Sequence, residues 1–431
     1  MKLWNPHCQR SVRPCRCQSE NVEYRPERSR CLWKMSNAAL DVIISHWEAV
    51  VCLVTFGITC KIPQMTMWTL IAVLPNLPID KSWELEFFAF AHPADPRLEA
   101  ICRSSIAAQA LLKNFKHPFK RGCRPCAFLM ADNCPKRFRS WEAMTDLRNA
   151  FAIAAVLHGW KHAVGSANIW FPQYSDYFDF YPLYPSPDGT GLICNGYALN
   201  SYDNAAAFEG QPYPDLPGPH GSFRVGVDKS LLNLLTAEWK AKYTISPSSW
   251  RQIAIFRSLS IAYRASGIPK GCEQLVFDIG IQLSLWVSAH ECLVHPGPNG
   301  HAGVNQVLAL LGKMQWRRHA LSVRRRHVLR NDKLTKPMTY VQHLYRRLND
   351  ARNNFLHGNP VGAKNAFLGP VSRELLSIQV APLIYCAALE AMLTVRQPRK
   401  KRTTEEIVVA VFRYNPLENA LLITREKRKK Y

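Results

Sequence analysis

Apolar residues recur at helical spacing through most of the second half of the chain. From residue 229 onward they fall three or four positions apart with polar residues between them, which is typical of helices that bury one face. This pattern predicts six helices, near residues 229–243, 248–265, 274–294, 304–329, 339–357 and 370–395. Helices joined by short loops pack side by side, so the sequence predicts an all-α bundle over residues 226–395.

The first half of the chain has a mixed pattern. Short β-rich apolar runs over residues 40–92 are punctuated by prolines, and a helical stretch follows over 94–117. A strand is predicted at Ala127–Met130. Loops and short strands are expected over 165–225, where Pro, Gly, Asp, Asn and Tyr are frequent. The fold class is therefore an α+β N-terminal domain over residues 36–225, followed by the helical domain.

A further helix in that first domain has its ends marked by single residues. Ser140 is a capping residue, and the apolar positions after it continue to His158. Gly159 follows and predicts the end of the helix.

The two ends of the chain fall outside both predicted domains. Residues 1–35 are polar and Arg-rich and are expected to be a disordered or spurious tail, with Met35 as a possible true start. Residues 396–431 form a basic tail. Within it, Glu406–Arg413 and Ala420–Thr424 have the composition of a terminal hairpin.

The predicted helix over 339–357 ends in a distinctive group of residues. Its apolar stripe consists of Val341, Leu344, Leu348, Ala351 and Phe355. Arg352 borders this stripe, and Gly358 and Pro360 stop the helix soon after His357. On an ideal helix, Arg352 and His357 would diverge by about 140°. The two side chains can therefore meet only if the helix ends at His357, or if two copies of the motif face each other.

The sequence Arg352-Asn353-x3-His357 resembles the Arg-x4-6-His signature of HEPN domains. Segments on either side resemble the ApeA-like HEPN branch, and a looser likeness covers about residues 66–220. The closer segments are Trp286–Gly297 and Leu344–Val361, and the looser ones are Leu74–Pro78, Asp146–Asn149 and Ser175–Pro182.

This resemblance implies a fold and an activity. The last four predicted helices correspond to a four-helix HEPN core, a module that in many proteins is a metal-independent ribonuclease. Arg352, His357 and the polar Asn353 would then be catalytic, with Asn353 a better candidate than Asn354. The setting implied is antiviral defence or a toxin, acting as a homodimer under an unknown trigger or antitoxin.

The chemistry of these residue types fits RNA cleavage. A neutral imidazole can take the proton of the 2′-hydroxyl, which then attacks the adjacent phosphate. A guanidinium matches the charge and geometry of the phosphorane oxygens. Because one His cannot be base and acid at once, two motifs in a dimer would share the proton transfers. The alternative interpretation is structural, with Arg352 tied to a helix end and His357 capping carbonyls.

Charge supports a polyanionic partner. The chain carries 55 Lys and Arg against 32 Asp and Glu, a net charge of +23, which points to RNA or to solvated tails. Five arginines lie close together within the predicted helix over 304–329, namely Arg317, Arg318, Arg324, Arg325 and Arg326. They would bind RNA phosphates if they lined the cleft, or they form a solvated face. Trp316 and Tyr340 beside them could stack on bases or simply pack.

Glu291 is the only acidic residue between Ile279 and Asn331. It lies in an otherwise apolar predicted helix. The functional interpretation makes Glu291 the partner that holds Arg352 in place. The alternatives are a surface carboxylate or a pair with a nearby arginine.

Cofactors, metals and membrane insertion are not expected. Cys123 and Cys126, with His117 and Cys134 nearby, suggest zinc or redox chemistry, but a structural zinc site usually has two paired ligand clusters. The longest apolar runs, Ala49–Cys60 and Met65–Leu74, are too short to span a bilayer. We therefore predict a soluble cytoplasmic protein with no zinc at Cys123 and Cys126.

A second function remains open from the sequence. The helical domain could be a non-catalytic module that binds RNA or a protein partner. RNA binding by pure dimeric protein without cleavage would favour that alternative.

Overall fold

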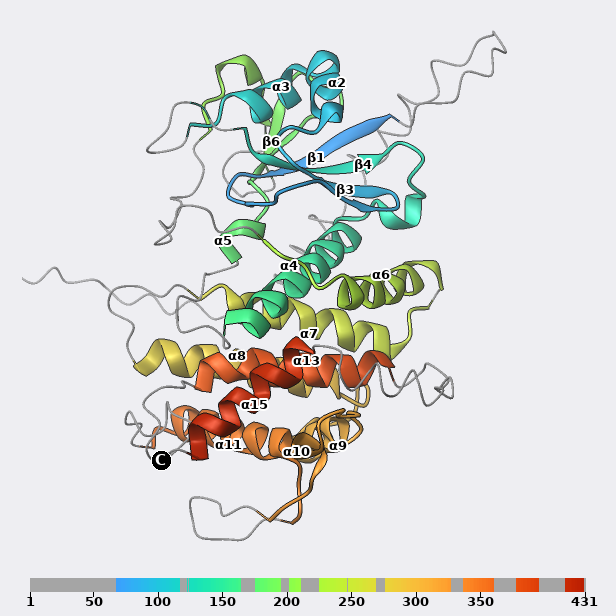
Figure 1. The fold of residues 1–431 in the computed structure, drawn as a ribbon. Helices are drawn as coiled ribbons and strands as arrows, with labels where there is room; N and C mark the ends of the chain where they lie inside the picture. Colours follow the sequence, from blue (N-terminus) through green and yellow to red (C-terminus); the bar gives the residue numbers. More distant parts are fainter. Residues whose placement is uncertain are drawn as a thin grey trace, which may run out of the picture. The chain divides into compact units, whose positions relative to one another are not determined.

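The computed structural model describes the chain in segments, and the order of their elements is drawn in Figure 1. The described residues are 67–116, 122, 124–163, 175–194, 201–210, 225–245, 247–268, 276–326, 336–359, 377–394 and 415–429. The predicted tail over residues 1–35 lies outside these segments. Within them, a small antiparallel-sheet region is followed by a mostly helical region, as the sequence predicts at this coarse level.

A four-stranded antiparallel sheet organises the first region. Its strands are β1 (Trp68–Leu74), β4 (Cys126–Ala131), β3 (Phe88–Ala91) and β2 (Trp83–Leu85), in that spatial order. Strand β4 confirms the predicted strand and is buried along its whole length. Because side chains alternate across a strand, Phe128 belongs to one hydrophobic core and Leu129 to the other.

Different helices supply these two cores. Helices α2 (Pro96–Ser104) and α3 (Ile106–Lys113) contribute residues to the core of Leu129. The long helix α4 (Trp141–Ala163) contributes to the core of Phe128, and its Phe151 stacks on Phe90 of β3 with ring centroids 4.2 Å apart.

The single helix predicted over 94–117 is divided in two. Ser105 ends α2 and starts α3 in an extended conformation, with φ −145° and ψ 120°, and its side chain accepts a hydrogen bond from the Ala108 backbone N–H. A serine in this position satisfies an orphan donor of the new helix, which stabilises the break. Apolar periodicity alone did not reveal this break.

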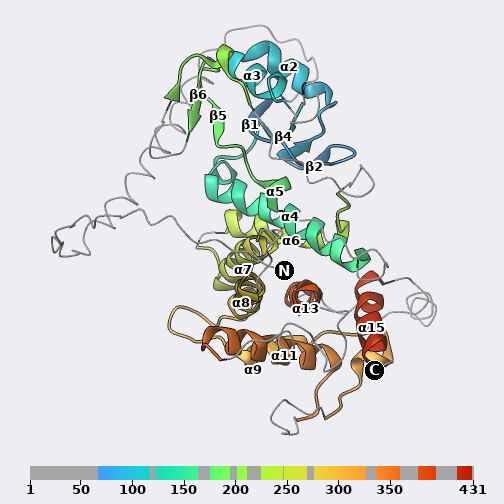
Figure 2. The same cartoon turned by 90° about the vertical axis from the view of Figure 1, so that its left-hand side faces the viewer.

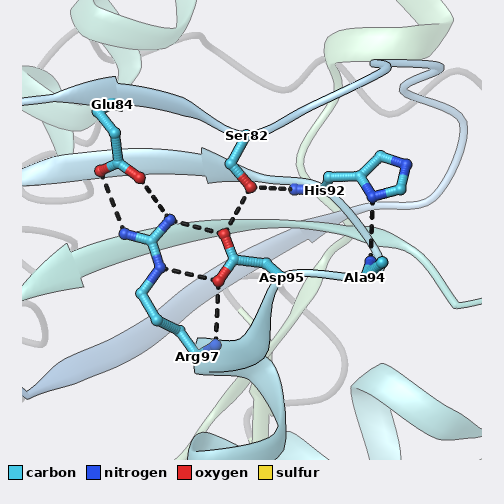
Figure 3. Close-up of polar contacts among 6 residues, drawn as sticks. All are labelled: Ser82, Glu84, His92, Ala94, Asp95 and Arg97. Atoms are coloured by element: carbon cyan, nitrogen blue, oxygen red, sulfur yellow. Dashed lines mark hydrogen bonds and ion pairs between the residues drawn. The ribbon is translucent and has the colours of Figure 1, made fainter.

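A polar network fixes the start of α2 (Figure 3). The Asp95 carboxylate caps the helix at the Arg97 N–H, accepts from the Ser82 hydroxyl at 2.5 Å and pairs with the Arg97 guanidinium at 2.7 Å. The His92 ring instead accepts from the Ala94 N–H of its own loop. The His92 backbone N–H, not its ring, donates to the Ser82 hydroxyl oxygen at 3.0 Å. Because the imidazole makes no described hydrogen bond to Ser82, the pair lacks the contact that nucleophilic catalysis needs, and the network is a helix cap.

Short irregular elements follow α4, in agreement with the composition of residues 165–225. They are α5 (Ser175–Phe178), the strands β5 (Leu183–Pro185), β6 (Leu192–Cys194) and β7 (Ser201–Tyr202), and a short 3₁₀ turn at Ala205–Ala207. Another 3₁₀ turn, Lys136–Phe138, precedes α4. The three strands form a second antiparallel sheet in the order β5-β6-β7.

The predicted end of α4 at Gly159 is wrong. The helix continues to Ala163, and both Trp160 and Lys161 are buried. The Lys161 ammonium lies 2.8 Å from an Asp228 carboxylate oxygen and 3.2 Å from one of Glu390. Packing and these ion pairs stabilise the last turn and outweigh the cost of one glycine within a helix.

The helical region contains the helices that the periodicity predicts, with two corrections. Its elements are α6 (Lys229–Thr244), α7 (Trp250–Ser266), α8 (Val276–Leu293), α9 (Val304–Leu311), α10 (His319–Ser322), α11 (Tyr340–Leu356), α13 (Ser377–Thr394) and α15 (Pro416–Lys429). In Figure 2, α13 is seen nearly end-on near α8, α11 and α15, and it contacts all three. Helix α13 is buried on all sides from Val380 to Leu389.

The predicted helix over 304–329 is the first correction. Helix α9 stops at Leu311, and α10 is a separate short helix beyond it. The chain is then extended, and Arg325 and Met338 exchange two backbone hydrogen bonds. The run of basic residues therefore lies on non-helical backbone.

The predicted C-terminal hairpin is the second correction. Ala420–Thr424 lies within α15, while Glu406–Arg413 falls outside the described residues. Leu417, Ala420, Leu421 and Thr424 are all buried, and their spacing of three, one and three residues is that of a helix face. Within the described segments, no helix combines the length and the apolar character needed to cross a bilayer.

Candidate functional site

The C-terminal end of α11 carries the Arg–His motif. Thr339 and Gln342 form a reciprocal capping box at the start of this helix. At its other end, the His357 N–H donates to the Asn353 carbonyl and the Asn359 N–H donates to the Asn354 carbonyl, both at 3.0 Å. Gly358 has φ +66°, a left-handed conformation that glycine adopts without strain. The helix thus ends at His357, as the sequence predicts.

Arg352 is held by two neighbours. Its Nη2 donates to Glu291 Oε2 at 3.1 Å, and its Nη1 donates to Asn353 Oδ1 at 3.0 Å. The pairing expected of Glu291 and Arg352 is therefore confirmed. Both side chains are about one-fifth exposed, at 22% and 21%, so the pair is partly screened from water. The Nε–H of Arg352 is buried and has no hydrogen-bond partner among the described residues.

His357 is not joined to this network within one chain. Its side chain is exposed at the helix end, and no described hydrogen bond connects it to Arg352. Among the described residues, the Asn354 side chain accepts one hydrogen bond, a long one of 3.4 Å from the Asn359 amide. Of the three residues implied by the resemblance, the structure brings Arg352 and Asn353 together and leaves His357 facing solvent.

Tyr345 is part of the site and was missed by the sequence interpretation. Burial raises the pKa of its hydroxyl, Glu291 raises it further and Arg352 lowers it. Its hydroxyl is buried and has no hydrogen-bond partner among the described residues. Tyr345 falls on α11 seven residues before Arg352, two turns away on the same face. That spacing is a signal that could have identified it.

The ring of His290 packs against those of Tyr345 and Tyr385 beside the site. The ring of His290 lies 5.0 Å from that of Tyr345 and 5.3 Å from that of Tyr385 on α13. His290 is completely buried, and its Nδ1 lies 2.7 Å from the Trp286 carbonyl oxygen. Burial lowers the pKa of His290 to about 4, against the opposing effect of the hydrogen bond to the Trp286 carbonyl. His290 is therefore a neutral core residue.

Glu291 also lines a cleft of about 300 Å³. Burial raises the pKa of Glu291, and Arg352 opposes that shift. The cleft lies between α7, the end of α8 and the segment leading to α9. It is lined by Trp250, Ala254, Arg257, Ile261, Glu291, Cys292, His295, His301 and Ala302.

The five arginines of the basic cluster, Arg317, Arg318, Arg324, Arg325 and Arg326, are all exposed. The buried Glu418 of α15 accepts hydrogen bonds from the backbone N–H groups of Arg317 and Arg318 at 2.7 and 3.1 Å, which fixes the main chain at the start of the cluster. Arg325 of the cluster pairs with Met338, just before the start of α11. Arg352 lies twelve residues after Tyr340, the first residue of that helix. At 1.5 Å per residue the two are roughly 18 Å apart along the helix axis.

The aromatic residues beside the basic cluster pack rather than stack on solvent-facing partners. Tyr340 is buried, and its hydroxyl lies 3.3 Å from that of Thr424. Trp316 is partly buried against the main hydrophobic core. Neither side chain is presented as a platform for bases.

The cysteine motif is only partly described, because Cys123 and His117 lie outside the described residues. Cys126 is buried in β4, with its thiol 2.9 Å from the Leu77 carbonyl oxygen. Burial raises the pKa of the Cys134 thiol to about 11. Nowhere in the described segments do three His, Cys, Asp or Glu side chains gather as a metal site would require.

Comparison with known proteins gives no match to this chain among family models, curated proteins or solved structures.

Proposed function

We propose that this chain is a metal-independent endoribonuclease of the HEPN type. The observation that supports this most directly is the arrangement of Glu291, Arg352 and Asn353 next to an exposed histidine at the end of one helix. A guanidinium oriented by a carboxylate and an amide is prepared to bind phosphate oxygens. The resemblance of residues 250–395 to the ApeA-like branch supplies the substrate class, RNA, and the setting, defence or a toxin.

The proposed mechanism uses the residues in separate roles. His357 of one copy accepts the proton of the 2′-hydroxyl, and the resulting alkoxide attacks the adjacent phosphorus. Arg352 stabilises the negative charge that develops on the phosphorane. His357 of the second copy donates a proton to the departing 5′-oxygen. The products are a 2′,3′-cyclic phosphate and a 5′-hydroxyl, and the cycle needs no metal or cofactor.

The experiment that tests this is cleavage of end-labelled RNA by Arg352→Ala and His357→Ala. Each variant is expected to lose activity by about 10²–10⁴-fold, because each lacks a group that acts in the transition state. Arg346→Ala, on the same helix, and His319→Ala, an exposed histidine on α10, are the matched controls and should cleave normally. Folded His357→Ala protein with wild-type activity would disprove the proposal, as would activity that disappears on addition of EDTA.

The mechanism requires a dimer, and an exposed apolar pair offers a surface for it. Ile281 and Leu356 are 49% and 53% exposed. Gly280 of α8 contacts the ring of Phe355 of α11, and Ile281 and Leu356 are the residues that follow these two in the chain. Leu356 also directly precedes His357. A second copy bound here would bring two His357 side chains near each other.

Substitution of this apolar pair tests the dimer separately from the chemistry. Ile281→Glu should produce a monomer and abolish cleavage, because a buried charge opposes association. Ile245→Glu is the control, since Ile245 is 60% exposed at the end of α6, away from the motif. Light scattering with size exclusion reports the mass. A strictly monomeric protein with full nuclease activity would contradict this part of the proposal.

The basic cluster favours a second candidate function, RNA binding without cleavage. Its arginines are exposed, and the main chain of Arg317 and Arg318 is fixed by Glu418. A combined Arg324→Gln, Arg325→Gln and Arg326→Gln variant should weaken RNA binding and reduce its salt dependence. Strong RNA binding by an inactive wild-type dimer would favour this candidate.

A further inference from the structure

The cleft beside Glu291 brings together groups from three separate segments. Trp250, Arg257 and Ile261 come from α7, Glu291 and Cys292 from α8, and His301 from the segment before α9. At about 300 Å³, the cleft lies at the lower end of the range for small-molecule sites. It shares one wall, Glu291, with the Arg352 network but none of the residues that we assign to catalysis.

The charges in this cleft favour an anion. Arg257 is an exposed cation, and His295 and His301 can both donate hydrogen bonds. The one carboxylate of the lining, Glu291, is already engaged by Arg352 at 3.1 Å. With that negative charge compensated, the cleft presents cationic and hydrogen-bond-donating groups to its contents.

The remaining lining is aromatic and apolar. The indole N–H of Trp250 donates to the His295 carbonyl oxygen at 2.7 Å, which anchors the ring at the edge of the cleft. The Trp250 and His295 rings lie 5.6 Å apart at an angle of 51°. Ala254 and Ile261 complete an apolar side. An anionic group at one side and a flat, partly apolar group at the other would match this surface.

Two other chemistries fit the cleft less well. Although Glu291, Cys292, His295 and His301 all line it, they do not form a metal-binding group of three among the described residues. Cys292 is a poor nucleophile here. Its thiol lies 3.8 Å from the Ala254 carbonyl oxygen, and burial raises its pKa.

We propose that this cleft binds one phosphate-bearing nucleoside, with the phosphate on Arg257 and His301 and the base against Trp250 and Ile261. The nucleoside is either a free nucleotide or one residue of an RNA strand. In the second case this inference rests on the proposed ribonuclease function and adds a subsite to it. Because Glu291 borders the cleft and pairs with Arg352, the nucleoside would lie next to the phosphate that is cut.

Binding is measured by calorimetry on the full-length protein with four probes. They are uridine and adenosine 5′-monophosphates, a four-nucleotide RNA carrying 2′-O-methyl groups that cannot be cleaved, and inorganic phosphate. Arg257→Gln should weaken binding of the nucleotide or the oligonucleotide by about tenfold or more, since it removes a charge-assisted contact. Arg264→Gln, an exposed arginine on the same helix outside the cleft, should bind as wild type does.

The outcomes separate the sources and can overturn the inference. Arg257-dependent binding of the monophosphates assigns the site to free nucleotides, and binding of the oligonucleotide alone assigns it to an RNA residue. Unchanged binding in both Arg257→Gln and Trp250→Phe would overturn the inference, as would inorganic phosphate that binds as tightly as the nucleotides. Absence of binding by any probe to the wild type would overturn it too.

These outcomes are independent of the ribonuclease proposal. His357→Ala should retain binding in the cleft, because His357 does not line the cleft and is not the residue that compensates the charge of Glu291. If RNA is cleaved in a His357-dependent way and Arg257→Gln binds and cleaves normally, only the cleft inference fails. If no RNA is cleaved and binding still depends on Arg257, only the ribonuclease proposal fails.

Discussion

At the scale of single residues, Arg352 decides what the site can do. Glu291 and Asn353 each use one N–H of a different terminal nitrogen of the guanidinium. Each terminal nitrogen carries a second N–H, so the geometry leaves two donors beyond those that hold the side chain. A lysine could not be held and still bind phosphate in this bidentate way. Arg352 can therefore be held in place by Glu291 and Asn353 and still donate hydrogen bonds to a phosphate.

Glu291→Gln should lower the free energy of unfolding by roughly 1–3 kcal/mol. The amide keeps the shape of the side chain but removes the charge that compensates Arg352, and partial exposure reduces the cost below that of a fully buried pair. Glu142→Gln is the control, because Glu142 pairs with Lys242 but is 71% exposed. Urea unfolding checks both variants. Unchanged stability and cleavage in Glu291→Gln would contradict a role for this pair.

His290 should make the protein less stable in mild acid. Its pKa falls from an ordinary value of 6.5 to about 4 in the folded state, so below pH 6.5 the unfolded chain takes up a proton that the folded chain does not. Its contribution is fully present above pH 6.5 and is lost as the pH falls toward 4. At 1.36 kcal/mol per pKa unit, the loss is roughly 3 kcal/mol.

The measurement for His290 is the slope of stability against pH. Urea unfolding of wild type and His290→Gln is measured from pH 7 to pH 4.5. Both proteins have the same carboxylates, so the effect of these groups cancels in the difference between the two slopes. The variant should show the shallower decline, whatever its absolute stability. Parallel declines would mean that His290 is protonated in the folded protein.

At the scale of elements, apolar periodicity predicted most helices and missed what interrupts or extends them. The stripe from Val341 to Phe355 located α11, and Gly358 located its end, because both signals are local. The break at Ser105 and the continuation through Gly159 depend on a cap and on tertiary packing, which periodicity does not contain. Residues 420–424 were interpreted as a strand because that segment is short and apolar, yet their buried face has helical spacing.

In the candidate site, too, local sequence signals were predicted and features that depend on tertiary packing were not. Glu291 was found because it is the only acid in a long basic and apolar stretch. The cleft was not predicted, because its lining comes from three segments that only folding brings together. The basic cluster was predicted as a group, but its distance from Arg352 became clear only when the predicted helix over 304–329 proved to be broken.

Gly280→Ala tests the crossing of α8 and α11. A Cβ at this position would lie 2.1 Å from Cδ2 of Phe355, so the ring must move although alanine favours the helix. We expect a loss of roughly 1–3 kcal/mol in the free energy of unfolding and reduced cleavage, because Phe355 lies between Arg352 and His357 in the chain. Gly303→Ala is the control, since its nearest neighbour is 3.5 Å away. A Gly280→Ala protein as stable as wild type would show that the crossing is loosely packed.

At the scale of the whole molecule, one hydrophobic core extends from the sheet to the last helix. The cluster that contains Phe128 of β4 also contains Leu235 of α6, Ile384 of α13 and Leu421 of α15. The predicted boundary between domains at residue 225 falls within the sequence span of this cluster, and it remains a prediction about units of folding. Helix α4 contacts α6, α7 and α13, so it is the element through which the two regions would be coupled.

Lys161 makes buried charged contacts between these helices. Its ammonium group joins α4 to Asp228, which caps α6, and to Glu390 of α13. Burial acts to lower the pKa of Lys161, but the surrounding negative groups outweigh it and the pKa is raised. Lys161→Met would leave two carboxylates uncompensated at about one-quarter exposure each, which we expect to cost roughly 2–4 kcal/mol.

Hydrogen exchange of Lys161→Met tests whether the molecule unfolds as one unit. If the regions are coupled through α4, amides of β4 and of α13 should lose protection together, because both exchange through the same global opening. Lys240→Met is the control, since Lys240 pairs with Glu86 at the surface and its loss should change protection little. Loss of protection in α13 with no change in β4 would contradict the coupling and support two domains that fold separately on either side of residue 225.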